Sequence, residues 1–200
     1  MNHTTAVILC GGAGERMGGL DKPLQPLLGR PVLERVLECL RPQLDVVVIV
    51  ANRRQDTYAV HGAPVVDDGG YKGRGPLAGI AAGLAAAGGD WILCVPGDAP
   101  LLPPDLLQRL RQALQRDAAD LAVVNDGSGR QPLCCLLPQR LLADLRAYLD
   151  IGGAAPRLWQ DRYHVAEADC SDWPRWAWSL NTPEEWAMAE QHLSQWKDPA

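Results

Sequence analysis

Residues 5–22 read TAVILCGGAGERMGGLDK, a β-branched apolar run followed at once by a loop rich in glycine. The run Thr5–Cys10 ends at Gly11 and Gly12, which is the pattern of a short buried strand. Because the loop glycines lack a Cβ, backbone N–H groups can approach phosphate oxygens closely, and Arg16 and Lys22 add positive charge. The stretch therefore predicts a phosphate-binding loop after a strand, as in nucleotide-using α/β enzymes.

This loop does not fit the two common glycine motifs of nucleotide-binding proteins. Met17 stands where GxGxxG would place its third glycine, and Leu20 stands where GxxxxGK[ST] would place its lysine. The sequence thus argues against a dinucleotide-binding loop and against a P-loop. An ordinary surface loop is the alternative, but the preceding strand and the two cations favour phosphate binding.

Segments with helix and strand periodicity alternate along the rest of the chain. Apolar residues in Pro31–Leu40 recur on one helix face, whereas Asp45–Ala51 is almost wholly apolar, as strands buried in parallel sheets are. Leu121–Asn125 and Leu133–Leu137 flank a turn and predict an antiparallel pair. The other expected elements are helices at Arg53–Val60, Pro76–Ala87, Leu106–Leu114, Leu141–Leu149 and Pro183–Leu193, and strands at Pro64–Val66 and Trp91–Val95.

Length and composition fit one globular domain spanning residues 1–200. Hydrophobic residues make up 47% of the chain and charged residues 22%, and the longest aliphatic run is far shorter than the ~20 residues of a membrane helix. A net charge of −5 speaks against nucleic acid as a partner. Six cysteines without a CxxC pair indicate a reducing compartment, so we expect a cytoplasmic protein without membrane contact.

Polar and glycine residues follow the predicted strands where each strand ends. Gly11 follows the first strand, Asn52 the second, Asp67 and Asp68 the third, and Asp98 the fourth. In open α/β sheets, ligands bind beyond the carboxyl ends of the strands, so these residues should line one site.

Asp98, in VPGDAPLLP, is the candidate metal ligand. A carboxylate at a strand end can hold Mg²⁺, which takes one or two protein carboxylates plus substrate phosphates. A turn aspartate bonded to local backbone is the alternative, and for Asp67 and Asp68 the two readings are balanced. Gly75 begins a helix rich in small residues that allow close approach, and Arg130 adds a cation towards the same edge.

Together the motifs resemble the molybdenum cofactor guanylyltransferase family, within the wider group of Rossmann-like nucleotidyltransferases. The family pattern LxGGxxxRMGxxK matches the opening loop, and the resemblance covers nearly the whole chain. The further matching motifs are VVDD at 65–68, GPLAGI at 75–80, PGDAPLLP at 96–103, RQP at 130–132 and LNTPEE at 180–185. The resemblance implies a three-layer αβα fold with a mostly parallel sheet and one antiparallel strand.

The resemblance also implies an activity and the residues that carry it. The family transfers GMP from GTP, with Mg²⁺, to the terminal phosphate of molybdopterin or Mo-molybdopterin and releases pyrophosphate. Chaperones of molybdoenzymes and other cofactor-biosynthesis proteins would be further partners. By position, Asp98 would hold Mg²⁺ and act in catalysis with Arg16 and Lys22 on the triphosphate. The remaining nucleotide contacts would be Leu9, Cys10, Gly11, Gly12, Val50, Asn52, Asp68 and Gly75.

Three positions depart from the family pattern. Val50 stands where an asparagine is common, so a nucleotide contact there uses the backbone or shifts to Asn52. SLNTPEE replaces NVNTPEE, which leaves Ser179 and Asn181 to face the pterin substrate. PGD replaces PCD, a change that we expect to be harmless.

Three alternatives stand beside the guanylyltransferase. Related cytidylyltransferases usually read LAAG in the first loop, so Gly12 favours the larger guanine by leaving out one methyl group. A non-catalytic nucleotide- or cofactor-binding module would not need Arg16, Lys22 and Asp98 together. A sugar-phosphate nucleotidyltransferase should need a longer chain than 200 residues.

Overall fold

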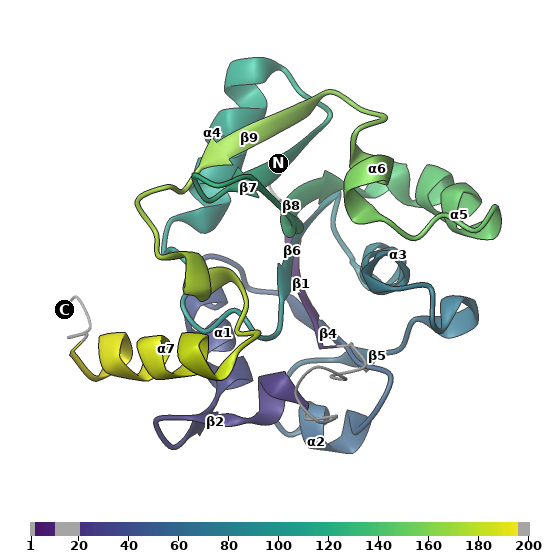
Figure 1. Ribbon diagram of the computed structural model, residues 1–200. Coiled ribbons are helices and arrows are strands. Elements are labelled where there is room, and N and C mark those ends of the chain that lie inside the picture. The colour runs from purple at the N-terminus through teal and green to yellow at the C-terminus, as the bar shows by residue number, and fades with distance from the viewer. Residues whose placement is uncertain (1–2, 11–20, 196–200) are drawn as a thin grey trace.

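The computed structural model describes residues 3–10 and 21–195. Within these ranges seven strands form one sheet in the order β5-β4-β1-β6-β8-β7-β9, which Figure 1 shows nearly edge-on. The strands are β1 (Thr4–Leu9), β4 (Val47–Val50), β5 (Val65–Val66), β6 (Trp91–Pro96), β7 (Leu121–Asn125), β8 (Arg130–Pro138) and β9 (Val165–Asp169).

Among the described strands of this sheet, only β8 runs against its neighbours. It pairs antiparallel with β6 and with β7, whereas β1, β4, β5 and β6 pair in parallel and so do β7 and β9. The mostly parallel sheet with one antiparallel strand is confirmed. Because parallel strands share a direction, the ends of β1, β4, β5 and β6 meet at one edge.

Helices cover both faces of the sheet and form a three-layer αβα arrangement (Figure 1). Ala6 and Ile8 of β1 face a core with α1 and α4, while Val7 and Leu9 face a second core with α3 and α5. Side chains that alternate between two buried faces explain the nearly continuous apolar strands. The helices are α1 (Val32–Leu40), α2 (Gln55–Ala59), α3 (Pro76–Ala86), α4 (Leu106–Asp117), α5 (Leu142–Asp150), α6 (Pro156–Gln160) and α7 (Pro183–Gln195).

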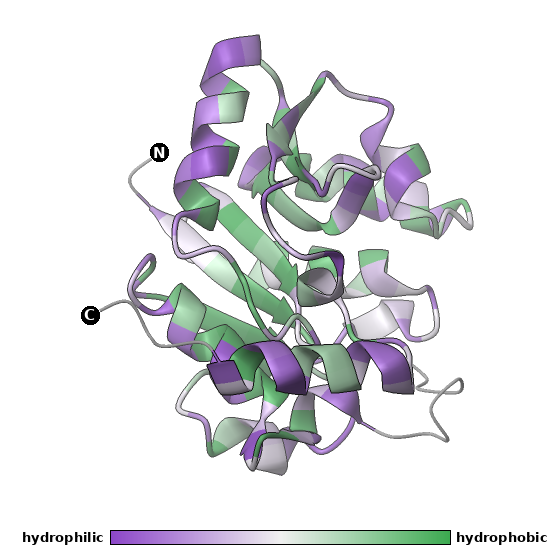
Figure 2. Cartoon of the chain, turned by 60° about the vertical axis from the view of Figure 1, so that its left-hand side comes forward, coloured by the Kyte–Doolittle hydropathy of each residue, from purple (hydrophilic) through white to green (hydrophobic). Residues whose placement is uncertain are grey.

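Figure 2 shows hydrophobic residues concentrated on the strands in the middle of the molecule, with hydrophilic residues on the surrounding helices. Helix α4 is amphipathic in this way, because Leu106, Leu110 and Leu114 are buried on one side of it. No helix in the described ranges has the length and apolar character needed to cross a membrane.

Several elements differ from the sequence-based expectations. Arg54 has a left-handed backbone with φ of 51°, so α2 begins only at Gln55 and the helix predicted from Arg53 is too long. Helix α6, strand β9 and the hairpin of β2 (Pro26–Leu27) and β3 (Arg30–Pro31) were not predicted. Strand β8 begins at Arg130, three residues before the predicted start.

Candidate active site

A cavity of about 510 Å³ lies at the carboxyl ends of β1, β4 and β5, beside the start of α3. Six of the residues predicted to bind nucleotide line it together, although they come from four separate segments of the chain. The crevice rule for α/β sheets therefore located the cavity correctly. The lining residues are Leu9, Cys10, Val50, Asn52, Arg53, Asp68, Lys72, Gly73, Gly75, Pro76 and Gly79.

Small residues shape the side of this cavity that α3 forms. Gly75 precedes the helix with φ of +72°, a conformation that a larger residue would adopt only with strain. A Cβ added at Gly79 would lie 3.0 Å from Leu9 Cδ2. The amino terminus of α3 thus borders the cavity, and the helix dipole favours an anionic ligand there.

Asn52 and Asp68 are joined by a hydrogen bond across the ends of β4 and β5. The backbone N–H of Asp68 donates to Asn52 Oδ1 over 3.1 Å, and Asp68 is only 9% exposed. Asn52 therefore fixes the backbone from which the Asp68 carboxylate projects. Both residues line the cavity, as the sequence predicts.

A second group of polar side chains gathers around Asp98, directly after β6. Lys22 Nζ donates to Asp98 Oδ2 over 3.2 Å and to Asn181 Oδ1 over 2.8 Å. The Ser179 hydroxyl donates to Asp98 Oδ2 over 3.0 Å and lies 3.3 Å from Asn181 Oδ1. The structure thus joins the predicted triphosphate cation, metal carboxylate and pterin residues in one network, which we call the Asp98 cluster.

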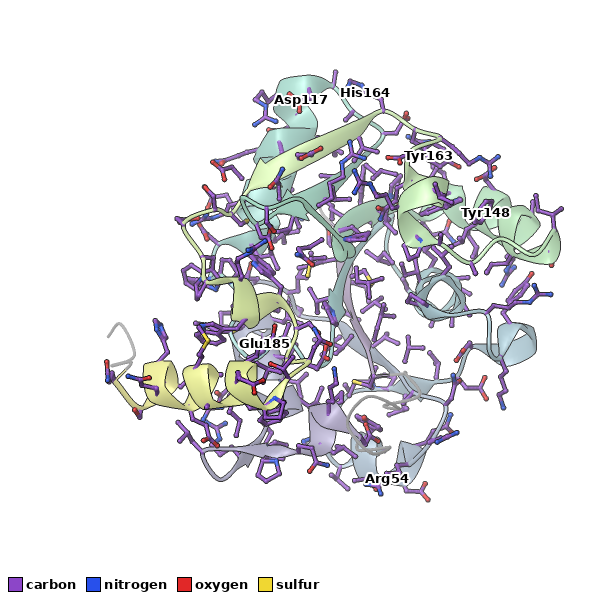
Figure 3. All side chains as sticks on the ribbon, viewed as in Figure 1. Arg54, Asp117, Tyr148, Tyr163, His164 and Glu185 are labelled. Carbon is purple, nitrogen blue, oxygen red and sulfur yellow. The ribbon has the colours of Figure 1, made fainter. Side chains whose placement is uncertain are left out.

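The start of α7 holds Asn181 of the Asp98 cluster in place. Glu185 Oε2 accepts from the backbone N–H groups of Asn181 at 2.6 Å and Thr182 at 3.0 Å, while Thr182 Oγ1 accepts from Glu185 N–H at 3.2 Å. This is a capping box, with Thr182 as the cap. Figure 3 shows Glu185 at the end of α7 that faces the body of the molecule.

The Asp98 carboxylate has the chemistry of a magnesium ligand. Its side chain is 17% exposed and lies 3.2 Å from the ammonium of Lys22, so a ligand can reach it. No group of three or more His, Cys, Asp or Glu residues within the described ranges could hold a metal ion. Mg²⁺ does not need such a group, since it commonly takes one or two carboxylates and completes its shell with phosphates and water.

The thiol of Cys10 is held in its neutral form. Burial raises the pKa of Cys10 well above its ordinary value, and the nearby carboxylates Asp21 and Asp98 raise it further. Cys10 therefore lines the cavity as a small, unreactive side chain rather than as a nucleophile.

The cavity lining also contains two cations, Arg53 and Lys72, that were not predicted as site residues. Lys72 lies in the segment GYKGRG, where a lysine between glycines gave a signal that could have been used. Arg130 instead belongs to an ion-pair group away from the cavity lining, with its guanidinium 2.6 Å from Glu167 Oε1 and 2.5 Å from Asp161 Oδ1.

Gly11, Gly12 and Arg16 lie outside the described residues, so their predicted contacts stay predictions.

Comparison with solved structures supports this assignment of the fold. Molybdopterin-guanine dinucleotide biosynthesis protein A from Archaeoglobus fulgidus superposes with a TM-score of 0.77, at 22% identity over 96% of this chain and 100% of the other. 2-C-methyl-D-erythritol 4-phosphate cytidylyltransferase from Thermus thermophilus gives a TM-score of 0.71, at 18% identity over 94% and 98%. Fold and site together define a nucleotidyltransferase-type α/β protein.

The sequence comparisons define the family. The model of the MobA-like NTP transferase domain matches residues 6–166. A molybdenum cofactor guanylyltransferase of Cupriavidus pinatubonensis is 42% identical over 90% of this chain and 93% of its own length, and one of Shewanella loihica is 39% identical over 95% of each chain. The chain belongs to the family of MobA-like NTP transferases.

Proposed function

We propose that this enzyme transfers GMP from GTP to the terminal phosphate of molybdopterin, forming molybdopterin guanine dinucleotide and pyrophosphate. The observation that carries the proposal is the Asp98 cluster, in which a lysine, a carboxylate and the Ser179–Asn181 segment meet at the same sheet edge as the cavity. The curated relatives are named for this reaction.

The reaction needs little acid–base chemistry from the protein. An oxygen of the acceptor phosphate forms a bond to the α-phosphorus of GTP, and the bond from that phosphorus to the α–β bridging oxygen breaks, so that both electrons leave with pyrophosphate. The acceptor phosphate is already ionised near neutral pH, so catalysis consists of alignment and charge neutralisation. Lys22 supplies a positive charge, and Asn181 and Ser179 are placed to orient the acceptor.

Asp98 is the residue that we expect to hold Mg²⁺. When bound, the ion would neutralise charge on the triphosphate. Lys22 and Asp98 pair with each other in the structure, so Lys22 must exchange this partner for phosphate oxygens when substrate arrives. Arg16, from the glycine-rich loop, remains the second proposed cation.

We propose GTP rather than CTP as the donor. The relatives named above are guanylyltransferases, and Gly75 and Gly79 keep side-chain volume small at the cavity wall. Asp68, nearly buried at the cavity wall, has a carboxylate that could accept hydrogen bonds from the N–H groups of guanine.

A non-catalytic binding module of the same fold is disfavoured by the Asp98 cluster. A module that only held a nucleotide would gain nothing from a metal-type carboxylate beside a lysine and the Ser179–Asn181 segment. We further propose a cytoplasmic location, because all six cysteines are free thiols, as is usual in reducing compartments. Molybdoenzyme chaperones remain the proposed recipients of the product.

Pyrophosphate release tests the proposed function. The protein is incubated with molybdopterin, Mg²⁺ and each of the four nucleoside triphosphates in turn, and we expect release with GTP alone. The Asp98→Asn variant should fold normally but release pyrophosphate at least ~100-fold more slowly, since it loses the charge that holds the metal. Release with CTP but not GTP would overturn the donor, and release with none would favour the binding module.

A further inference from the structure

The cavity at the carboxyl ends of β1, β4 and β5 carries opposite charges on neighbouring strand ends. Asp68 lies shortly after β5 and Arg53 shortly after β4, and both side chains line the cavity. Asp68 is only 9% exposed, and its carboxylate accepts no hydrogen bond from a described residue. Arg53 is exposed, and its guanidinium has no hydrogen-bond or ion-pair partner in the described part of the chain. The pair therefore indicates a ligand that offers both hydrogen-bond donors and acceptors.

Hydrogen bonds hold the backbone that carries Arg53. Asn52 Oδ1 accepts from the Asp68 N–H over 3.1 Å, which ties the residue before Arg53 to the end of β5. The Gln55 side-chain amide donates to Ala51 O over 3.0 Å and closes the turn between β4 and α2. Arg53 and Asp68 thus start from backbone positions that are fixed relative to each other before a ligand arrives, which lowers the entropy lost on binding.

The cavity suits the base of the nucleotide rather than its phosphates. Its volume of about 510 Å³ is in the range of small-molecule sites, and Leu9, Val50 and Pro76 give it apolar walls for the faces of a ring. Lys22 and Asp98, which we propose to bind the triphosphate and Mg²⁺, do not line it. With the phosphates at the Asp98 cluster, the base is the part of GTP that remains for the cavity.

Guanine presents donors and acceptors on adjacent parts of its edge. N1–H and the 2-amino group donate, and a carboxylate can accept from both. O6 and N7 accept, and the forked guanidinium of an arginine can donate to both, as it does to guanine in DNA. Adenine has an amino group in place of O6 and no hydrogen on N1, so it would place a donor against the arginine and an acceptor against the carboxylate. Asp68 and Arg53 together match guanine and mismatch adenine.

We propose that Arg53 is a specificity-determining residue: its guanidinium donates to O6 and N7 of guanine, while the Asp68 carboxylate accepts from N1–H and the 2-amino group. This inference deepens the proposed function and rests on the proposed use of GTP. Lys72 is the other cation of the cavity lining, but its side chain is 64% exposed and its ammonium lies 3.8 Å from Asp67. An ammonium also lacks the planar fork that two neighbouring acceptors require.

The competing explanation is that Arg53 only adds positive charge that attracts the phosphates of GTP. The chain offers a matched control in Arg54, the next residue, which does not line the cavity. Figure 3 shows Arg54 at the start of α2, at the outer edge of the molecule. Arg53→Met and Arg54→Met remove the same charge from adjacent positions, so an effect of charge alone should appear in both variants.

The experiment measures the Kd of wild type, Arg53→Met and Arg54→Met for GTP and for 7-deaza-GTP, each with Mg²⁺, by calorimetry. 7-deaza-GTP replaces N7 by a C–H group and keeps O6, N1–H, the 2-amino group and the triphosphate. We expect wild type and Arg54→Met to bind GTP about tenfold more tightly than 7-deaza-GTP, and Arg53→Met to bind both equally. The Tm of Arg53→Met should match that of wild type, because an exposed side chain is replaced.

A second nucleotide tests the contact with O6. 2-amino-ATP keeps the 2-amino group and the triphosphate of GTP but carries an amino group in place of O6, and we expect its disadvantage against GTP to shrink about tenfold in Arg53→Met. If Arg53→Met keeps the preference of wild type for GTP over both analogues, Arg53 does not contact the base and the inference is overturned. Failure of wild type itself to bind GTP would instead contradict the proposed function.

Discussion

Lys22 joins the end of β6 to the segment before α7. Its ammonium lies 3.2 Å from Asp98 Oδ2 and 2.8 Å from Asn181 Oδ1, although 159 residues separate Lys22 from Asn181. An arriving triphosphate must compete for this cation. The energy of the Lys22–Asp98 pair is modest because both groups touch solvent, so a polyanion can displace it.

At Gly12, one absent methyl group underlies the expected choice of base. Gly12→Ala adds that methyl group, and we expect kcat/KM for GTP to fall at least ~10-fold while the Tm changes by little. Steady-state kinetics with GTP and CTP measure the effect. Unchanged kinetics with GTP would remove Gly12 from the account of specificity.

Gly97 and Cys10 share one small space beside the end of β6. In Gly97→Ala the new Cβ would lie 2.6 Å from Cys10 Sγ and 3.0 Å from Pro23 Cγ, so we expect a loss of about 1–3 kcal/mol in the free energy of unfolding. Urea denaturation measures this loss. The double variant Cys10→Ala/Gly97→Ala should regain most of it, because the sulfur is gone. A stable single variant would contradict this packing.

Among the elements, α7 has the clearest local signal for its start. Thr182 and Glu185 form the capping box that the sequence NTPEE announces, and Pro183 occupies the first turn. The structure assigns the cap to Thr182, whose Oγ1 accepts from the Glu185 N–H. The side chain of Asn181 does not cap the helix and instead accepts a hydrogen bond from Lys22 in the Asp98 cluster.

Removal of the cap should loosen α7 and, with it, the acceptor side of the site. We expect Thr182→Ala to cost about 1 kcal/mol of helix stability and to raise the KM for molybdopterin more than the KM for GTP. Hydrogen exchange of the first-turn amides and steady-state kinetics are the measurements. Ser194→Ala, near the other end of α7, is the control and should leave both KM values unchanged.

Helices and strands with a clear periodicity of apolar residues were predictable from the sequence, and those without it were not. Helix α1 and strand β4 follow from their apolar patterns because both are buried by contact with the sheet or with helices. Strand β9 (VAEAD) was missed because only Ala166 and Ala168 are buried along it. The hairpin of β2 and β3 was missed because its strands are two residues each and its turn uses positive φ at Leu28 and Gly29.

At the scale of the whole molecule, ion pairs tie the outer strands together. Arg130 on β8 donates to Glu167 on β9, across the intervening β7, and Glu167 also accepts from Asn125 over 2.5 Å. The hydrogen bond from Arg130, then that from Asn125, lower the pKa of Glu167. Local sequence patterns do not predict these contacts, because Asn125, Arg130 and Glu167 lie on three different strands.

The ion pair between Arg130 and Glu167 predicts how the free energy of unfolding depends on pH. A carboxyl whose pKa is lowered in the folded state stabilises the fold above its unfolded pKa, near ~4.3 for glutamate, and loses that contribution as the pH falls through the lowered value. Glu167→Gln should therefore be less stable than wild type at pH 7, and the difference should shrink below pH ~4. Urea denaturation between pH 7 and pH 3 measures it. Glu190→Gln, exposed on α7, should show no such trend.

The position of the site was predictable, but its internal contacts were not. From the sequence alone, the rule for α/β sheets predicts that Asn52, Asp68 and Asp98 lie at one edge of the sheet. The contacts of Lys22 with Asn181, and of Tyr58 with Asp21, depend on how α7 and α2 pack against that edge. Such long-range packing leaves no mark in local sequence patterns.

The fate of a labelled α-phosphate tests the central claim most directly. The protein is incubated with Mg²⁺, molybdopterin and GTP that carries ³²P at the α-phosphate, and the products are separated and weighed by mass spectrometry. We predict that the label moves to a molybdopterin guanine dinucleotide, one equivalent for each pyrophosphate released. Label that stays in GTP, or that appears as free GMP, would contradict the assignment of this fold and site to guanylyl transfer.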